Sequence, residues 1–408
     1  METGYLGSVL NGMAPVLDMV PNLLERQLIL AGTMTRFLNC DSLHDLAQTY
    51  DINKDALYAS FDAISPPRWL RRLVKRGRER LAIHLRKWHD GDASYKSRHP
   101  ITLCADDFTR MTRGVLGGWT GLFYSGAAKK VVPGINVEAL AAVIGDGKEV
   151  IILAVRLVPP SPEGQGRPPL NHNQWLRKAL RELATSLTTR STSLMGCPLV
   201  VDAAYVSPEN VALIHDMGMH MVSRLAANRL VVGDVDGPLK ANVGLFAELT
   251  AFLHNPPYRE LRGEEDVRYQ RHTVFVSSLK VDVVMVTFIH DCDLMTFFST
   301  KTSMKTMTLR NILRYRWQLE RIFWIMKQDI GVGDIHHKTK ERCEARLYLH
   351  FLLAQATRDA AAHFKCSPKD IVRGIRRFPG LTLQRIGFQS TFAWPLPCNS
   401  VLNERYAA

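Results

Sequence analysis

The sequence has few cysteines, and they are not spaced to form a framework. Its 408 residues include 7 cysteines that lie far apart, and no two of them form a CxxC pair. An odd count without close pairs excludes a disulfide-rich scaffold and gives no zinc-site spacing. We therefore expect buried thiols in a reducing compartment.

Long apolar runs are also missing. No uninterrupted stretch of about 18 apolar residues occurs, so no membrane span is expected. The N-terminal segment METGYLGSVLNGMAP has neither the basic start nor the apolar run of a signal peptide. These two absences favour a cytoplasmic or nucleoid-associated protein.

Acidic residues are in deficit. The chain has 52 Lys and Arg against 39 Asp and Glu, a formal net charge of +13. This excess suits a polyanionic partner, because each phosphate that is neutralised releases condensed counterions. A surface kept soluble by positive charge is the alternative, and the charge alone does not decide between the two.

Residues 1–95 are expected to form a helical, DNA-binding N-terminal domain. The apolar spacing in 42–61 is typical of a small helix-turn-helix, although an ordinary helical hairpin would show it too. Residues 68–88 are expected to form a basic helix with one apolar face, whose charged face would contact phosphates or simply be solvated. The residues of this helix expected to bind DNA are Arg68, Arg71, Arg72, Lys75 and Arg76.

The rest of the chain predicts an α/β fold with an RNase H-like catalytic core. In residues 96–228, three antiparallel strands, a helix and then strand, helix, strand follow one another, which is the order of that core. Residues 229–300 read as a mainly β insertion, and 301–365 as the remainder of the core with two long helices. Residues 366–408 are expected to be a C-terminal tail. The fold class is thus a mixed sheet flanked by helices, with a β insertion and a helical N-terminal domain.

Carboxylates occupy three positions that suit metal-dependent chemistry. Asp106 and Asp107 close the first core strand, Asp202 follows the fourth, and Glu320 lies inside a predicted helix. Mg²⁺ prefers hard oxygen ligands, and two such ions can activate the attacking oxygen and stabilise the leaving oxygen of a phosphodiester. Taken singly, an Asp after a strand is more often a turn former or helix cap, and Glu320 could simply pair with Arg316.

The segment LRYRWQLERIFWIMK, residues 313–327, resembles the signature helix of the IS4 family of bacterial insertion-sequence transposases. That family reads Tyr, two residues, Arg, three residues, catalytic Glu, six residues, Lys. Arg316, Glu320 and Lys327 fall on the last three positions, and Trp317 stands where the family commonly has tryptophan. The tyrosine position holds Leu313, which departs from the pattern.

Two further blocks carry the resemblance, which covers residues 101–356. Residues 200–225 are similar to the second-aspartate block of the family, and FFSTKTSM resembles the strand that leads into the signature helix. The first-aspartate block leaves a choice. Asp107 fits the Asp-x-Ser/Thr pattern that RNase H-like enzymes often show and is slightly favoured, while Asp106 fits a plain strand-end aspartate.

The resemblance implies a DDE transposase that cuts DNA at transposon ends and transfers the strand into target DNA. Asp107 or Asp106, together with Asp202 and Glu320, would bind two Mg²⁺ ions, for which Mn²⁺ is expected to substitute. Arg316, Trp317 and Lys327 would bind DNA beside them. A basic stretch with Lys338 and Lys340 is also expected to face DNA.

The expected partner is DNA, bound by a homodimer or a larger assembly in the bacterial cytoplasm, with no membrane involved. Two alternatives remain open at this point. The chain could be a catalytically inactive, transposase-derived DNA-binding protein, or a structure-specific DNA nuclease. All three acidic positions are filled, which favours an active enzyme, and the Arg–Glu–Lys spacing favours a transposase through the resemblance.

Overall fold

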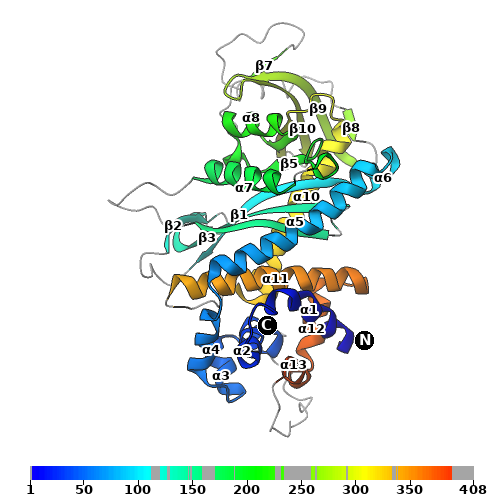
Figure 1. The fold of residues 1–408 in the computed structure, drawn as a ribbon. Helices are drawn as coiled ribbons and strands as arrows, with labels where there is room; N and C mark the ends of the chain where they lie inside the picture. The colour runs from blue at the N-terminus through cyan, green and yellow to red at the C-terminus, as the bar shows by residue number, and fades with distance from the viewer. Residues whose placement is uncertain are drawn as a thin grey trace. The chain divides into compact units, whose positions relative to one another are not determined.

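The chain divides into two compact units (Figure 1). The first unit comprises Met1–Pro66, Ile325–His337 and Glu341–Ala408, and the second comprises Pro67–Trp324 with Lys338–Lys340. The computed structural model describes residues 2–111, 120–125, 129–145, 147, 149–158, 171–187, 189–225, 231–233, 259–261, 264–290, 293–332, 337 and 339–387. None of the helices in these described ranges is long and apolar enough to cross a membrane.

The first unit is helical in its described residues. Its main helices are α1 (Glu2–Leu17), α2 (Leu23–Thr33), α3 (Leu43–Thr49), α4 (Lys54–Ala59), α11 (Lys340–Phe364), α12 (Pro368–Arg376) and α13 (Pro379–Ile386). Several begin at a polar residue that accepts a hydrogen bond from the third backbone N–H of the helix, as Ser42 does for α3 and Asn53 for α4. The helical pair expected at 42–61 is therefore present as α3 and α4, and its use in reading DNA stays a prediction.

The second unit is built on one mixed sheet. Its strands are β1 (Ile101–Met111), β2 (Gly121–Ser125), β3 (Lys130–Ile144), β4 (Glu149–Val158), β5 (Pro198–Val201), β6 (His220–Arg224), β7 (Val231–Gly233), β8 (Arg259–Leu261), β9 (Glu264–Val276), β10 (Val281–His290) and β11 (Asp293–Ser299). They lie in the order β2-β3-β1-β5-β6-β11-β10-β9-β7, with β4 also paired to β3 and β8 to β9. Strands β1, β3 and β4 are antiparallel, whereas β5 and β6 run parallel to β1.

This strand arrangement confirms the predicted mixed α/β fold and is compatible with an RNase H-like core. The expected β-rich stretch 229–300 contributes strands that extend the same sheet beyond β6. Residues 234–258 of that stretch lie outside the described residues. Its status as a separate insertion therefore stays a prediction.

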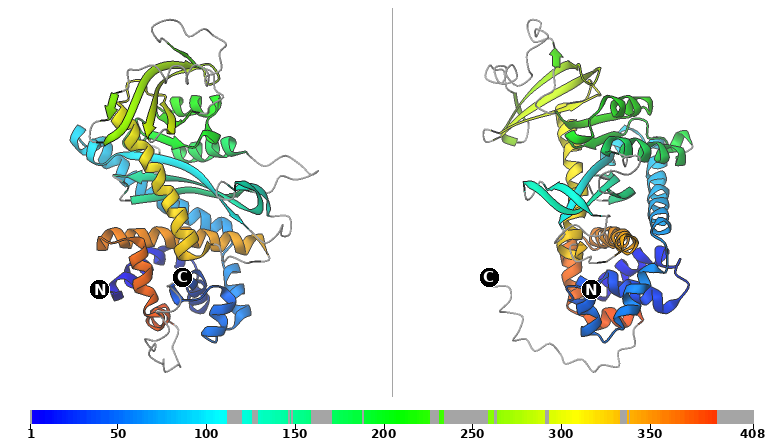
Figure 2. Two further views of the ribbon diagram at one scale, coloured as in Figure 1. Left: turned by 180° about the vertical axis from the view of Figure 1, so that it is seen from behind. Right: turned by 90° about the vertical axis from the view of Figure 1, so that its left-hand side faces the viewer.

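Helices cover both faces of the sheet. They are α5 (Pro66–Asp90), α6 (Ala93–Arg98), α7 (His172–Ser186), α8 (Pro208–Asp216) and α10 (Thr306–Ile325). The right-hand view of Figure 2 shows α10 on one side of the strands and α5 on the other. Alternate side chains of a strand point to opposite faces, and in β1 Leu103 and Ala105 pack with Leu81 of α5 and Leu176 of α7 in one buried cluster.

The neighbouring positions of β1 face α10 instead. The Phe108 ring lies 4.7 Å from the Phe323 ring, measured between centroids. The sheet thus separates an α5/α7 face from an α10 face, and the parity of a residue in β1 decides which of them it joins. This rule places the two aspartates of β1 on different faces.

Gly145-Asp146-Gly147 between two apolar runs is a sequence pattern that predicts a hairpin turn, and strands β3 and β4 form this hairpin. Gly145 and Gly147 have φ values of +62° and +81°, which L side chains adopt only with strain. Residues 136–144 of β3 pair antiparallel with residues 149–158 of β4 on either side of this turn. Asp146, the middle residue of the expected turn, lies outside the described residues.

Gly77 allows α5 to lie directly against strand β4. A Cβ atom at this position would stand 2.0 Å from the backbone oxygen of Ile152. We expect Gly77→Ala to lower the free energy of unfolding by about 1–3 kcal/mol, because overpacking against a backbone atom outweighs the gain of about 1 kcal/mol in helix propensity. Urea denaturation of the two proteins measures the difference.

Gly7 in α1 is the matched control for this substitution. A Cβ atom there would meet nothing within 4 Å, so Gly7→Ala is expected to stabilise the protein by up to about 1 kcal/mol. Equal stability of Gly77→Ala and wild type would show that α5 and β4 are not packed this closely.

The two compact units divide the chain differently from the expected domains. Helix α5, expected within the N-terminal domain, lies in the second unit because Leu81 and Leu85 pack into the core of the sheet. Residues 366–387, expected as part of a tail, form α12 and α13 of the first unit. The first of the two long helices expected within 301–365 is α-helical only to Ile325 and continues as a π-helical turn, Met326–Ile330.

Candidate active site

Two of the expected carboxylates meet one guanidinium on the α10 face of the sheet. Arg316 Nη1 donates to Oδ2 of Asp106 over 3.0 Å, and its Nη2 lies 2.8 Å from Oε1 of Glu320, one turn along α10. Strand β1 supplies the aspartate and α10 supplies the other two residues. The ion pair between Glu320 and Arg316 that the sequence allowed is therefore present, and Arg316 also pairs with Asp106 on the same face of the sheet.

Asp106 is an unusual carboxylate because its burial disfavours the ionised form. Its side chain is buried, with 7% of the residue exposed. Burial raises the pKa of Asp106 to about 7, the Arg316 guanidinium opposes this rise, and Glu320 adds to it. The backbone N–H of Asp107 donates to Asp106 Oδ1 over 3.0 Å and also favours the ionised form. A desolvated carboxylate of this kind gains from a nearby cation.

Asp202 directly follows strand β5, next to the two aspartates of β1. Strand β5 pairs parallel with β1, and Ala105 is opposite Val201, so the next residues along the two strands are Asp106 and Asp202. The backbone of Asp202 is still extended, with φ −74° and ψ 162°, which preserves the alternation of side chains. Val201 packs in the α5/α7 core, whereas Asp202 is exposed and its negative charge acts on Asp107.

Asp107 belongs to a different cluster on the α5/α7 face. Asn136 Nδ2 of β3 donates to its Oδ2 over 3.0 Å. Burial raises the pKa of Asp107, while this hydrogen bond and the nearby His172 lower it. Glu138 and Asp202 act on the same carboxyl group through their negative charge. The structure thus assigns the adjacent aspartates of β1 to two separate polar environments.

Glu138 is the centre of that second cluster. It is fully buried on β3 and pairs with Arg156 of β4 and with His172 at the start of α7. Burial by itself raises the pKa of Glu138, but the hydrogen bonds with His172 and Arg156 outweigh it, and the net pKa is lowered. The hydrogen bond with Glu138 raises the pKa of His172. The two partners therefore favour the ionised form of this buried carboxylate.

The residues expected to bind DNA occupy several places. Trp317 is 60% exposed on α10, three residues before Glu320. Arg68, Arg71, Arg72 and Lys75 of α5 are exposed, and Arg76 is half-buried. Lys327 is exposed in the π-helical turn, which belongs to the first unit. Lys340 begins α11, and Lys338 lies outside the described residues.

A metal site is not preformed in the described part of the chain. Among those residues, no three His, Cys, Asp or Glu side chains come together closely enough to hold a metal ion. The donor chemistry nevertheless fits, because Asp106 and Glu320 offer hard oxygen donors and already share one cation, the Arg316 guanidinium. The carboxylates are therefore placed to receive a cation at this point.

Sequence reasoning missed two features of this region. The Glu138–Arg156–His172 cluster was not singled out, although a glutamate within the apolar run of β3 is a signal of a paired buried charge. Trp324 is 49% exposed and lies four residues after Glu320, on the same side of α10 as Trp317 and Glu320. An aromatic pair at this spacing in the sequence would also fit an apolar helix face.

The fold and the positions of the acidic residues together indicate a class of enzyme. A mixed sheet flanked by helices, with one acidic residue in the middle of β1, another directly after the parallel strand β5 and a third on a covering helix, is compatible with an RNase H-like transposase core. Residues 176–355 match the sequence model of the transposase DDE domain family. This match supports a DDE transposase; it includes Asp202 and Glu320 and begins after β1 with Asp106 and Asp107. No curated protein matches the chain.

Proposed function

We propose that this chain is a cut-and-paste DDE transposase of the IS4 type, which cleaves DNA at transposon ends and joins the freed strand to target DNA. One observation carries the proposal most directly. Arg316 links Asp106 of β1 to Glu320 of α10, and the register between β1 and β5 brings Asp202 next to the aspartates of β1. Two neighbouring strands and one helix would thus supply the three acidic positions of a DDE enzyme.

Asp106, Asp202 and Glu320 are the residues that would hold divalent metal, with Mg²⁺ the expected ion and Mn²⁺ a substitute. When bound, two such ions activate the attacking oxygen and stabilise the leaving oxygen of a phosphodiester displacement. The geometry favours Asp106 over Asp107 as the first aspartate, because Asp106 shares a face with Glu320. Asp107 would instead hold β1 against β3 through its hydrogen bond with Asn136.

Arg316 has two possible anionic partners in this proposal. Its guanidinium pairs with both carboxylates, and its planar fork also suits a phosphate of bound DNA. Trp317 and the exposed cations of α5 would hold more distant parts of the DNA. Lys327 and Lys340 are proposed as further phosphate contacts, and a dimer or larger assembly on paired ends is part of the same proposal.

The test is DNA cleavage and strand transfer with labelled DNA that carries the sequence flanking the gene of this protein. Wild type is expected to cut and join this DNA with Mg²⁺, whereas Asp202→Asn and Glu320→Gln are expected to bind it and to lose at least about 10³-fold in cleavage rate. Asp216→Asn and Glu341→Gln make the same substitutions at exposed positions of α8 and α11 and should react like wild type.

The other outcomes separate the alternatives. Cleavage without joining would indicate a structure-specific nuclease. Binding that weakens with salt, with no cleavage by wild type, would indicate a DNA-binding protein without activity. Full cleavage by Glu320→Gln would show that the carboxylates assigned to the site are wrong.

A further inference from the structure

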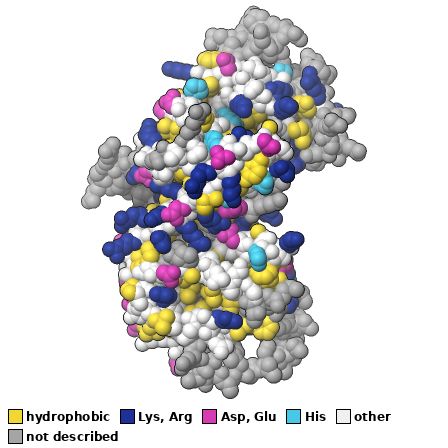
Figure 3. Space-filling model, turned by 45° about the vertical axis from the view of Figure 1, so that its right-hand side comes forward, with side chains coloured by type: hydrophobic (Ala, Val, Ile, Leu, Met, Phe, Trp, Pro, Cys, Tyr) yellow, Lys and Arg dark blue, Asp and Glu magenta, His cyan; other side chains and the backbone are white. Residues whose placement is uncertain are grey.

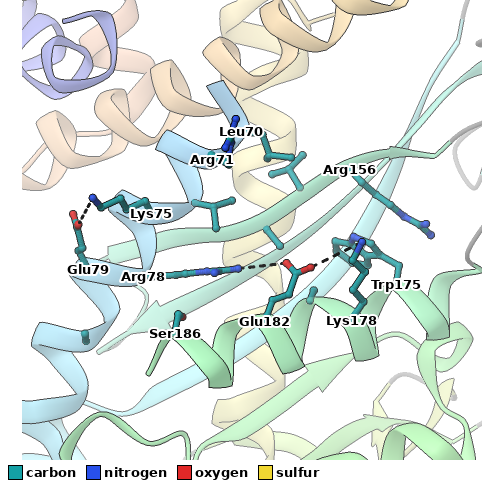
Figure 4. A pocket seen from close by; sticks show the side chains of 15 residues that line it. Leu70, Arg71, Lys75, Arg78, Glu79, Arg156, Trp175, Lys178, Glu182 and Ser186 are labelled. Atoms are coloured by element: carbon teal, nitrogen blue, oxygen red, sulfur yellow. Dashed lines mark ion pairs between the residues drawn. The ribbon is translucent and has the colours of Figure 1, made fainter. Parts of the chain in front are cut away.

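A groove lies on the face of the sheet opposite to Arg316 and Glu320, within the second unit. Helices α5 and α7 form its walls and strand β4 its floor, and its volume is about 730 Å³ (Figure 4). The charged residues that line it are Arg71, Lys75, Arg78, Glu79, Arg156, Lys178 and Glu182. Arg156 is already paired with Glu138, which leaves four cations against two acids and makes the groove electropositive, and both helices contribute cations.

The two acids of the groove only partly compensate its other four cations, which are Arg71, Lys75, Arg78 and Lys178. Lys75 lies 3.8 Å from Glu79, and both side chains are about two-thirds exposed, so this pair contributes little. Glu182 is shared, 3.6 Å from Arg78 and 4.0 Å from Lys178, and Figure 4 shows Arg78 of α5 reaching across to it. One carboxylate between two cations leaves positive charge over.

Arg78 is the most constrained of these cations. Its Nε atom is buried without a hydrogen-bond partner, although a guanidinium has five N–H donors to satisfy. Burial lowers the pKa of Arg78, which means that its charge is destabilised, and the neighbouring Glu182 only partly opposes this. An additional anion in the groove would stabilise the charge of Arg78.

Positive charge also continues beyond the groove. In the space-filling view, Lys and Arg side chains are interspersed with fewer Asp and Glu side chains on the visible side of the second unit (Figure 3). Along α5, the exposed Arg68 and Arg72 extend the row of cations past Arg71. A long row of like charge suits a polymer with evenly spaced phosphates better than a short acidic peptide. The cavity cannot enclose a duplex, but one sugar–phosphate backbone can lie along it.

We propose that this groove between α5 and α7 binds the sugar–phosphate backbone of DNA, on the face of the sheet opposite to the carboxylates. The proposal rests on the proposed function in so far as DNA is the substrate. It adds Arg78 and Lys178 to the DNA contacts and gives the chain two DNA-binding faces. It requires no cleavage, so it can be tested by binding alone.

The experiment compares two triple variants in their binding to a short fluorescein-labelled duplex of arbitrary sequence. The groove variant carries Arg71→Ala, Lys75→Ala and Lys178→Ala, which are all exposed residues. The control carries Arg86→Ala, Lys87→Ala and Arg181→Ala, which remove the same charge from exposed positions of the same two helices outside the groove. Fluorescence anisotropy is followed between about 50 and about 200 mM salt.

The groove variant is expected to bind at least about tenfold more weakly than the control, and the slope of log affinity against log salt should fall by about 3. Equal slopes for the two variants would overturn the proposal, because the effect would then come from net charge. Unchanged DNA binding with a lost affinity for labelled polyglutamate would also overturn it, in favour of an acidic protein partner. Groove-dependent binding by a wild type that never cuts DNA would refute the proposed function alone.

Discussion

Asp106→Asn is expected to abolish DNA cleavage, with a loss of at least about 10³-fold, whereas Asp107→Asn is expected to stay within about tenfold of wild type. The reason is the pleat of β1, which directs Asp106 toward Arg316 and Glu320 and directs Asp107 toward Asn136. An asparagine at position 107 still offers a carbonyl oxygen to the Asn136 amide. Cleavage of labelled DNA under single-turnover conditions measures both rates.

The opposite result would be equally informative. If Asp107→Asn abolishes cleavage and Asp106→Asn does not, the Asp-x-Thr spacing identifies the ligand and the face assignment fails. Asp216→Asn, an exposed residue of α8, serves as the control for nonspecific effects of the substitution.

The stability of Asp106→Asn without added metal provides a second test. The pKa of Asp106 is raised from 3.8 to about 7 by burial, so the folded state holds this proton more tightly than the unfolded state. Wild type therefore loses stability as the pH rises from about 4 through about 7. Asp106→Asn has no such proton to lose, and its free energy of unfolding should exceed that of wild type at about pH 8 and match it more closely at about pH 4.

Glu138→Gln is expected to lower the free energy of unfolding by about 3–5 kcal/mol, because it leaves Arg156 and His172 without their fully buried carboxylate. Glu149→Gln is the matched control. Glu149 also pairs with one arginine, Arg80 over 2.6 Å, and one histidine, His84 over 2.9 Å, but its side chain is 25% exposed. Its replacement should lower stability by about 1 kcal/mol.

The effect of Glu138→Gln should depend on pH in a defined window. The lowered pKa of Glu138 contributes stability above its unfolded value of 4.5, which is lost as the pH falls through the folded pKa. The raised pKa of His172 contributes stability below 6.5, which is lost as the pH rises through its folded pKa. The two proteins should therefore differ most between pH 4.5 and 6.5, and a difference that grows steadily above this window would contradict the pairing.

Much of the fold could be predicted from the sequence because its signals are local. Alternating apolar residues and the glycines at 145 and 147 predict strands β3 and β4, and periodic apolar residues predict helices α7 and α10. The grouping of elements could not be predicted in this way. Leu81 and Leu85 would suit any apolar surface, and only the sheet in three dimensions assigns α5 to the second unit.

The candidate site was predictable in its residue types and less so in its arrangement. Spacing picked out Arg316 and Glu320, which the structure brings together. The choice between Asp106 and Asp107 depends on the register of β1 against β5, a long-range pairing that no local pattern records. The buried cluster around Glu138 could not be predicted, because its partners Arg156 and His172 come from other elements.

Arg316 gives the acidic site its own counter-ion. Carboxylates that gather without compensation repel one another and oppose the collapse of the chain around them, and many metal sites are completed only when the ion arrives. Here a guanidinium from α10 already bridges Asp106 and Glu320, so the second unit can assemble from the newly made chain before any metal is captured. If the proposed DNA cleavage depends on a divalent metal, a chelator would stop cleavage without unfolding the protein. Adding the metal ion back would restore cleavage without a refolding step.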